Sequence, residues 1–175
     1  MRYLIIIDVQ NDFVSGSLGT AEARQMLPAL LKKASEFEGK IIMTKDTHGD
    51  DYPDTQEGKK LPVPHCVKGT AGWEFPEALE KIQKEKQAKV YEKSCFGSRE
   101  LAEDIRRLYE EGKIDSVELT GLCTDICVVS NALLIKAAAP ELPVSVDASC
   151  CAGVTPQKHE AALEVMESCQ VTIER

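Results

Sequence analysis

The chain has 175 residues, of which 43% are hydrophobic and 29% charged, and its formal net charge at pH 7 is −8. This length suits one domain, residues 1–175, with a sizeable core, and an acidic chain without a Lys/Arg stripe excludes a nucleic-acid partner. No segment approaches the ~18 apolar residues that span a bilayer, and the apolar run Leu4–Ile7 is too short for a secretory signal. We therefore expect a cytoplasmic protein without a membrane partner.

Strand-like apolar runs alternate with helix-like stretches along the chain. The expected strands span residues 3–7, 40–44, 89–93, 116–121, 143–148 and 170–173. The expected helices span residues 21–37, 77–85, 99–111, 124–138 and 156–168, and a long irregular stretch covers residues 46–76. This alternation predicts an α/β fold, a doubly wound and mainly parallel six-stranded sheet with helices on both faces. Irregular stretches as long as 46–76 are often functional.

Polar side chains gather where the expected strands end. Asp8 ends the first strand, Asp46 and His48 follow the second, Lys93 ends the third, and residues 123–127 follow the fourth. In an open parallel sheet, ligands bind beyond the carboxyl ends of the strands, near the point where the strand order reverses. These polar groups are therefore expected to meet at one edge of the sheet.

Cys127 is a candidate nucleophile, because the first turn of a helix over 124–138 would lower the pKa of its thiol. Asp8 ends an apolar strand, where a carboxylate is costly unless it is paired or used. Each residue also has an ordinary structural reading: a buried cysteine, a turn aspartate and, for Lys93, a solvated lysine. The three together match a thiol nucleophile with a proton-carrying acid and a cation. His159 is expected to be a structural histidine.

A second cluster lies in the irregular stretch and contains Asp46, His48, Glu57 and His65. Two of the three histidines of the chain fall here, and Asp46 precedes the first by two residues. Nitrogen and oxygen ligands of this kind suit a divalent zinc, iron or manganese ion. The spacing alone is a weak signal, because loops are rich in acidic residues.

Three segments, IIIDVQNDF, KSCFGS and TGLCTDICVVSNAL, resemble in order and spacing the signature segments of the isochorismatase-like cysteine hydrolases. A fourth, DTH followed by LPVPHCVKGTAGWEF, resembles the metal-site loop of the nicotinamidase branch. The resemblance runs from residue 3 to about residue 173. It implies the fold expected above and a small-molecule amide as substrate.

The resemblance implies roles for four residues. Cys127 would be the nucleophile, Asp8 the proton shuttle and Lys93 their electrostatic partner. It also implies a cis peptide bond between Leu122 and Cys123. The backbone N–H groups of Cys123 and Cys127 would then form an oxyanion hole, in which each donor is worth roughly 10²–10³ in rate.

In nicotinamidases the metal faces the substrate pocket and receives the pyridine nitrogen. Asp46, His48 and His65 match the ligand positions of that branch directly. Glu57 occupies a position that is His or Glu in the family, and Asp54 is its rival as the fourth ligand. The metal would orient a ring nitrogen and leave the nucleophile to its own activators.

One segment departs from the nicotinamidase pattern. Those enzymes often carry an aromatic residue shortly before the last metal histidine, whereas this chain has LPVPH. Phe13 and Phe96 would then remain as the aromatic wall of the substrate pocket. The departure leaves the exact substrate open.

The leading hypothesis is a cysteine-dependent amidohydrolase that converts a small primary amide, with nicotinamide as the first candidate, into acid and ammonia through a thioester. A carbamoyl amidohydrolase or another isochorismatase-like hydrolase is the first alternative, and neither needs a loop metal. A catalytically silent metal-binding module is the second, and it leaves Asp8 and Lys93 unexplained. A homo-oligomer, dimer or tetramer, is also expected.

Overall fold

A computed structural model describes all 175 residues and contains one six-stranded sheet in which every strand pair is parallel. The strands are β1 (Arg2–Ile7), β2 (Lys40–Asp46), β3 (Lys89–Lys93), β4 (Ser116–Leu122), β5 (Val144–Ala152) and β6 (Thr172–Glu174). Their order is β3-β2-β1-β4-β5-β6, which places the reversal point between β1 and β4. The predicted α/β fold is confirmed, with a fully parallel sheet.

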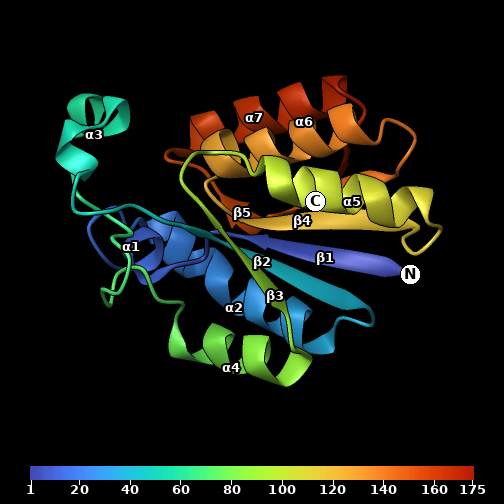
Figure 1. Cartoon of the computed structure of the whole chain (residues 1–175), viewed down its shortest axis with the longest axis horizontal. Helices are drawn as coiled ribbons and strands as arrows, with labels where there is room; N and C mark the ends of the chain where they lie inside the picture. Colours follow the sequence, from blue (N-terminus) through green and yellow to red (C-terminus); the bar gives the residue numbers. More distant parts are fainter.

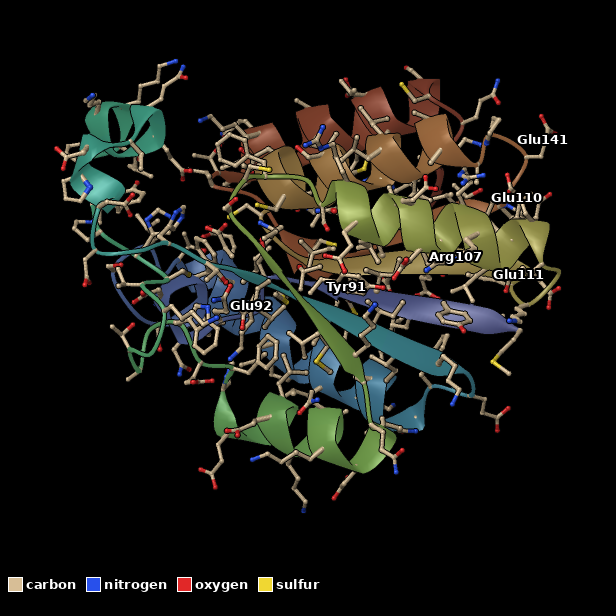
Figure 2. All side chains as sticks on the ribbon, viewed as in Figure 1. Tyr91, Glu92, Arg107, Glu110, Glu111 and Glu141 are labelled. Carbon is tan, nitrogen blue, oxygen red and sulfur yellow. The ribbon has the colours of Figure 1, made fainter.

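Helices cover both faces of the sheet (Figure 1). One layer contains α2 (Ala21–Glu36) and α4 (Glu77–Lys86), and the other contains α5 (Arg99–Glu110), α6 (Val129–Ala138) and α7 (Pro156–Ser168). Charged side chains such as Arg107 and Glu110 project outward from α5 (Figure 2). None of these helices combines the length and the hydrophobicity of a membrane-spanning segment.

The central strand β1 supplies both halves of the core. Leu4 and Ile6 pack with α2 and α4, whereas Ile5 and Ile7 pack with the other helix layer. Successive side chains of a strand point to opposite faces, so four apolar residues in a row predict a strand that is covered on both sides. All four are at most 1% exposed.

The stretch 46–76 was expected to be irregular throughout. This expectation is wrong for two short helical segments, η1 (Tyr52–Asp54) and α3 (Gln56–Lys60). The hydroxyl of Thr55 accepts a hydrogen bond from the N–H of Gly58 at 2.9 Å and caps α3. A five-residue helix is too short to show a hydrophobic period, which explains why the sequence pattern missed it. The same applies to α1 (Asn11–Val14).

The helix expected over 124–138 begins with a separate π-helical turn, η2 (Thr124–Val128), before α6. The carbonyl oxygen of Cys123 accepts hydrogen bonds from the N–H groups of both Ile126 and Val128, each at 3.1 Å. Such π turns are frequent at functional sites. Cys127 therefore lies in this turn and not in the first turn of an α-helix.

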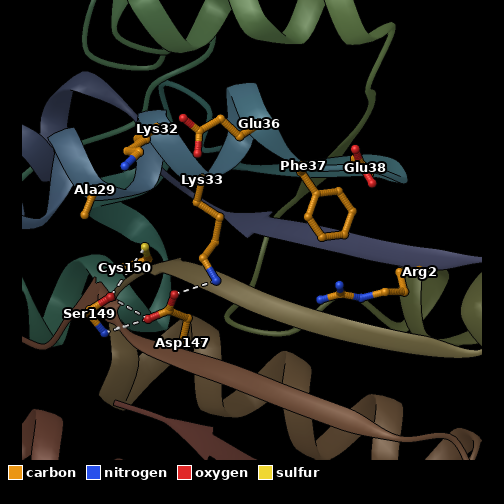
Figure 3. A pocket seen from close by; sticks show the side chains of 10 residues that line it. All are labelled: Arg2, Ala29, Lys32, Lys33, Glu36, Phe37, Glu38, Asp147, Ser149 and Cys150. Atoms are coloured by element: carbon orange, nitrogen blue, oxygen red, sulfur yellow. Dashed lines mark hydrogen bonds and ion pairs between the residues drawn. The ribbon is translucent and has the colours of Figure 1, made fainter.

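A buried ion cluster joins α2 to the sheet. Lys33 contacts the carboxylate of Glu118 on β4 and lies 2.6 Å from Oδ2 of Asp147 on β5. Figure 3 shows the Lys33 side chain reaching toward Asp147 across a cavity that Arg2 also lines. Burial disfavours every charge here, yet hydrogen bonds from Lys33 and Ser149 hold the pKa of Asp147 below its usual value.

We predict that Lys33→Met lowers the free energy of unfolding at pH 7 by about 3 kcal/mol, because it leaves the buried carboxylate of Asp147 without a cation and leaves Glu118 with Arg2 alone, whose Nη2 lies 3.3 Å from Oε2 of Glu118. The depressed pKa of Asp147 stabilises the wild type above the usual aspartate pKa, and this contribution is lost as the pH falls through the folded-state value. In Lys33→Met, by contrast, a buried carboxylate that has lost its cation favours the protonated, neutral form. The difference in the free energy of unfolding between wild type and variant should therefore become smaller as the pH is lowered from 7 to about 4.

Urea unfolding at both pH values measures this difference. Lys32→Met is the matched control, since Lys32 is an exposed neighbour on α2 that makes no ion pair. An equal loss for both variants, or a difference that does not change with pH, would contradict the role of the cluster.

Candidate active site

Asp8, Lys93 and Cys127 meet beyond the carboxyl ends of β1, β3 and β4. Nζ of Lys93 lies 2.5 Å from Oδ2 of Asp8 and 3.4 Å from Sγ of Cys127. The three residues are only 0%, 5% and 4% exposed. Three distant segments therefore place a thiol, a carboxylate and an ammonium in contact, shielded from water.

The two central strands approach closely beside this group. Gly121 on β4 pairs with Ile7 on β1 and has φ +118°, and a Cβ at this position would lie 2.1 Å from the carbonyl oxygen of Ile7. Only glycine fits both the conformation and the space. The expected cis peptide bond between Leu122 and Cys123 is present one residue further on.

Thr44 on β2 fixes the Asp8 carboxylate. The Thr44 hydroxyl donates to Oδ1 of Asp8 at 2.6 Å and accepts from the Asp8 N–H at 3.1 Å. Oδ2 forms the ion pair with Lys93 but accepts no hydrogen bond of good geometry. Beyond its contact with Lys93, this oxygen has lone pairs that could accept a proton from a neighbouring group.

The pKa of the Cys127 thiol is shifted in the direction opposite to the prediction. Burial and the negative charge of Asp8 raise its pKa well above the usual value, while Lys93 acts in the opposite direction. The predicted lowering by a helix end is wrong, because desolvation of a fully buried thiolate outweighs the partial charge of one turn. Burial likewise raises the pKa of Asp8 despite Lys93. Cys127 therefore rests as a neutral thiol, and its ionisation needs a nearby base.

The second cluster brings Asp46, His48, Glu57 and His65 together, with one ligand atom from each lying within 4.8 Å of the others. Nε2 of His48 is 2.9 Å from Oδ2 of Asp46, and Nε2 of His65 is 3.6 Å from both that oxygen and Oε1 of Glu57. The rival Asp54 is exposed and lies outside the cluster. Two imidazoles and two carboxylates at this spacing fit a divalent zinc, iron or manganese ion.

The state of the ligand atoms also suits a metal. Nδ1 of His65 lies 2.8 Å from the carbonyl oxygen of Val63, so Nδ1 carries a proton and Nε2 faces the cluster. Burial opposes the charge on Asp46, but hydrogen bonds with His48 and His65 hold the pKa of Asp46 well below its usual value. The carboxylate is thus ionised, as a metal ligand must be.

Asp46 belongs to both groups of side chains. Its Oδ2 contacts His48, and its Oδ1 lies 3.2 Å from Nζ of Lys93. The position follows from register, since Asp46 pairs with Lys93 at the ends of β2 and β3. The candidate metal cluster and the thiol group are therefore two halves of one site.

Both halves open into one cavity of about 770 Å³. The predicted pocket residues Phe13 and Phe96 line it, and the ring centroid of Phe13 lies 5.5 Å from that of His65. Phe13 is buried, whereas Phe96 is 46% exposed. Cys123 also lines the cavity, where burial raises the pKa of its thiol to about 12.

The sequence patterns missed three polar residues around the site. Thr44 holds Asp8, as described above, and Tyr52 packs on the histidines of the second cluster. Gln10 is fully buried, donates to the carbonyl oxygen of Asp46 at 2.9 Å and accepts from its N–H at 2.8 Å. The available signal was a polar residue within an apolar run, in KIIMT for Thr44 and in IIIDVQ for Gln10. His159 lies outside the site, where its Nδ1 is 2.7 Å from the Thr124 hydroxyl.

The isochorismatase domain family matches the chain over residues 2–175. The nicotinamidase/pyrazinamidase of Mycobacterium tuberculosis is 32% identical over an alignment of 188 positions, gaps included, which covers 99% of this chain and 98% of that protein. The solved structure of the nicotinamidase/pyrazinamidase from Bacillus subtilis has a TM-score of 0.84 at 26% identity and covers 99% of each chain. The pyrazinamidase of Pyrococcus horikoshii in complex with zinc has a TM-score of 0.78 at 25% identity, covering 99% of this chain and 98% of its own.

Proposed function

The chain belongs to the isochorismatase domain family, and we propose that it is a single-domain, cysteine-dependent amidohydrolase that converts nicotinamide into nicotinate and ammonia. The observation that carries the proposal is the buried contact of Lys93 with both Asp8 and Cys127, at one end of a cavity that also contains the metal-binding cluster. Relatives and solved structures with the names nicotinamidase and pyrazinamidase support this choice of substrate.

The first half of the reaction forms a thioester. Asp8 removes the thiol proton of Cys127, and the thiolate attacks the amide carbon. The negative charge on the carbonyl oxygen is stabilised by the backbone N–H groups of Cys123 and Cys127. The Cys123 N–H donates to no protein acceptor, which supports this role. Asp8 then returns the proton to the leaving nitrogen, which departs as ammonia.

The second half of the reaction releases the acid. Asp8, again a carboxylate, takes a proton from a water molecule that attacks the thioester carbon. The carbon–sulfur bond breaks, and the thiolate of Cys127 recovers the proton. Lys93 stays protonated throughout, because the cost of burial is outweighed by the negative charges of Asp8 and Asp46, which raise its pKa. Its charge stabilises each anion that forms beside it.

Asp46, His48, Glu57 and His65 would hold a divalent metal ion, as their geometry and ligand chemistry fit. When bound, the ion supplies a Lewis acid for the ring nitrogen of a pyridine carboxamide. Phe13, beside His65, would pack on the ring and exclude water from it. The zinc complex of the Pyrococcus horikoshii pyrazinamidase makes zinc the first candidate.

We predict that Cys127→Ala lowers ammonia release from nicotinamide by at least about 10⁴-fold, because no other group can form the thioester. Circular dichroism should show an unchanged fold, since the substitution removes one sulfur atom. Cys123→Ala is the matched control: it lines the same cavity but contributes only backbone in this mechanism. Near wild-type turnover in Cys127→Ala would rule out the mechanism.

Asp8→Asn should lower kcat by about 10²–10⁴-fold with little change in substrate affinity. An amide occupies the same space and still accepts the Thr44 hydrogen bond, but it cannot carry the proton. Steady-state kinetics separate kcat from KM, and inhibition by nicotinate reports binding directly. A loss confined to affinity would assign Asp8 a structural role instead.

Protein purified without chelator should contain one divalent metal ion per chain by elemental analysis. His48→Ala and Glu57→Gln should lose it, whereas His159→Ala should retain it, because the third histidine of the chain lies outside the cluster. Chelation should weaken substrate binding and leave Cys127 open to alkylation. A metal-free wild type that hydrolyses nicotinamide at full rate would contradict the proposed metal site.

A further inference from the structure

Tyr52 is buried among the side chains of the second cluster. It is 1% exposed and is not among the residues that line the cavity of the candidate active site. Its ring centroid lies 4.7 Å from that of His48 and 5.1 Å from that of His65, at interplanar angles of 64° and 76°. The two histidine rings are themselves 4.8 Å apart at 71°. Three rings therefore pack edge to face against one another, a favourable aromatic arrangement.

The two histidines are held in different ways. Nδ1 of His65 has a hydrogen-bond partner in the carbonyl oxygen of Val63 at 2.8 Å. The hydrogen bonds of the structure give His48 a partner at Nε2, which is Asp46, and none at Nδ1. A metal-binding histidine ordinarily has its other ring nitrogen fixed by a hydrogen bond. For His48, ring packing with Tyr52 takes the place of that bond.

The hydroxyl of Tyr52 holds the remaining part of the cluster. It donates to the carbonyl oxygen of Leu61 at 2.8 Å. Glu57 lies on α3, between Tyr52 and Leu61 in the chain, and α3 lies beyond the carboxyl ends of the strands (Figure 1). The bond closes residues 52–61 into a short loop and keeps Glu57 next to the histidines.

From these contacts we infer that Tyr52 is the positioning residue of the metal site: its ring orients His48 and His65, and its hydroxyl anchors the segment that carries Glu57. The inference rests on the metal site proposed above. The ring of Tyr52 acts on the two histidines and its hydroxyl acts on the segment of Glu57. Mutation can therefore test the ring and the hydroxyl separately. Tyr52 touches no reacting atom and acts through the ligands alone.

The test measures the dissociation constant for Zn²⁺ by competition with a chromophoric chelator. Tyr52→Phe keeps the ring and should weaken binding several-fold through a less ordered Glu57. Tyr52→Leu also removes the ring and should weaken binding about 10–100-fold, the usual effect of losing a group that orients a ligand. The visible absorption spectrum of the Co²⁺-loaded protein should change in Tyr52→Leu, since it reports ligand geometry.

Tyr91→Leu is the matched control. Tyr91 is also a buried tyrosine and lies on β3 (Figure 2). Its hydroxyl donates to Oδ2 of Asp104 at 2.5 Å, and neither residue lines the cavity. This variant should lose stability but keep the Zn²⁺ affinity and the Co²⁺ spectrum. Equal weakening in Tyr91→Leu and Tyr52→Leu would show a general effect of lost packing and overturn the inference.

The remaining outcomes separate the two proposals. If the wild type binds no Zn²⁺, the proposed metal site itself is wrong. If the wild type and Tyr52→Leu bind Zn²⁺ equally well, the metal site stands and the role of the Tyr52 ring is contradicted. If Tyr52→Leu does not fold, Tyr52→Phe decides: wild-type affinity in that variant overturns the anchoring of Glu57, and several-fold weakening supports it.

Discussion

The ammonium group of Lys93 is the charge on which the site depends. It is 5% exposed and lies within 3.4 Å of Asp8, Asp46 and Cys127. A lone buried ammonium is costly by several kcal/mol, so it persists only where anions surround it. The same lysine compensates the burial of two carboxylates, and it is the one cation beside the thiol. Removal of Lys93, Asp8 or Asp46 therefore leaves the remaining charged groups incompletely compensated.

The sheet explains how this charge group is built. Asp46 and Lys93 are register partners at the ends of β2 and β3, and Ile7, just before Asp8, is the partner of Gly121. Parallel pairing thus delivers side chains from four strands to one edge, at the point where the strand order reverses. Because Asp46 uses one oxygen for Lys93 and the other for His48, the thiol half and the metal half cannot move independently.

The apolar runs and helical periods were sufficient to predict the fold, because burial on both faces leaves a clear pattern in strands such as β1 and β2. The residues that meet at the strand ends were also predictable, since only the order of elements was needed. The short helices around Tyr52 were not, because one turn leaves no period. Nor was the raised pKa of Cys127, which depends on how completely packing excludes water. The positions of Thr44 and Gln10 depend on long-range hydrogen bonds, of which a single sequence carries no record.

The central claim is that Cys127 forms a covalent bond to the carbonyl carbon of the substrate. An analogue of nicotinamide with an aldehyde in place of the amide, labelled with ¹³C at that carbon, tests it directly by NMR, because no turnover is required. We predict a signal in the thiohemiacetal region with the wild-type protein and its absence with Cys127→Ser. A bound analogue whose label remains in the aldehyde region, while it competes with substrate, would contradict the account.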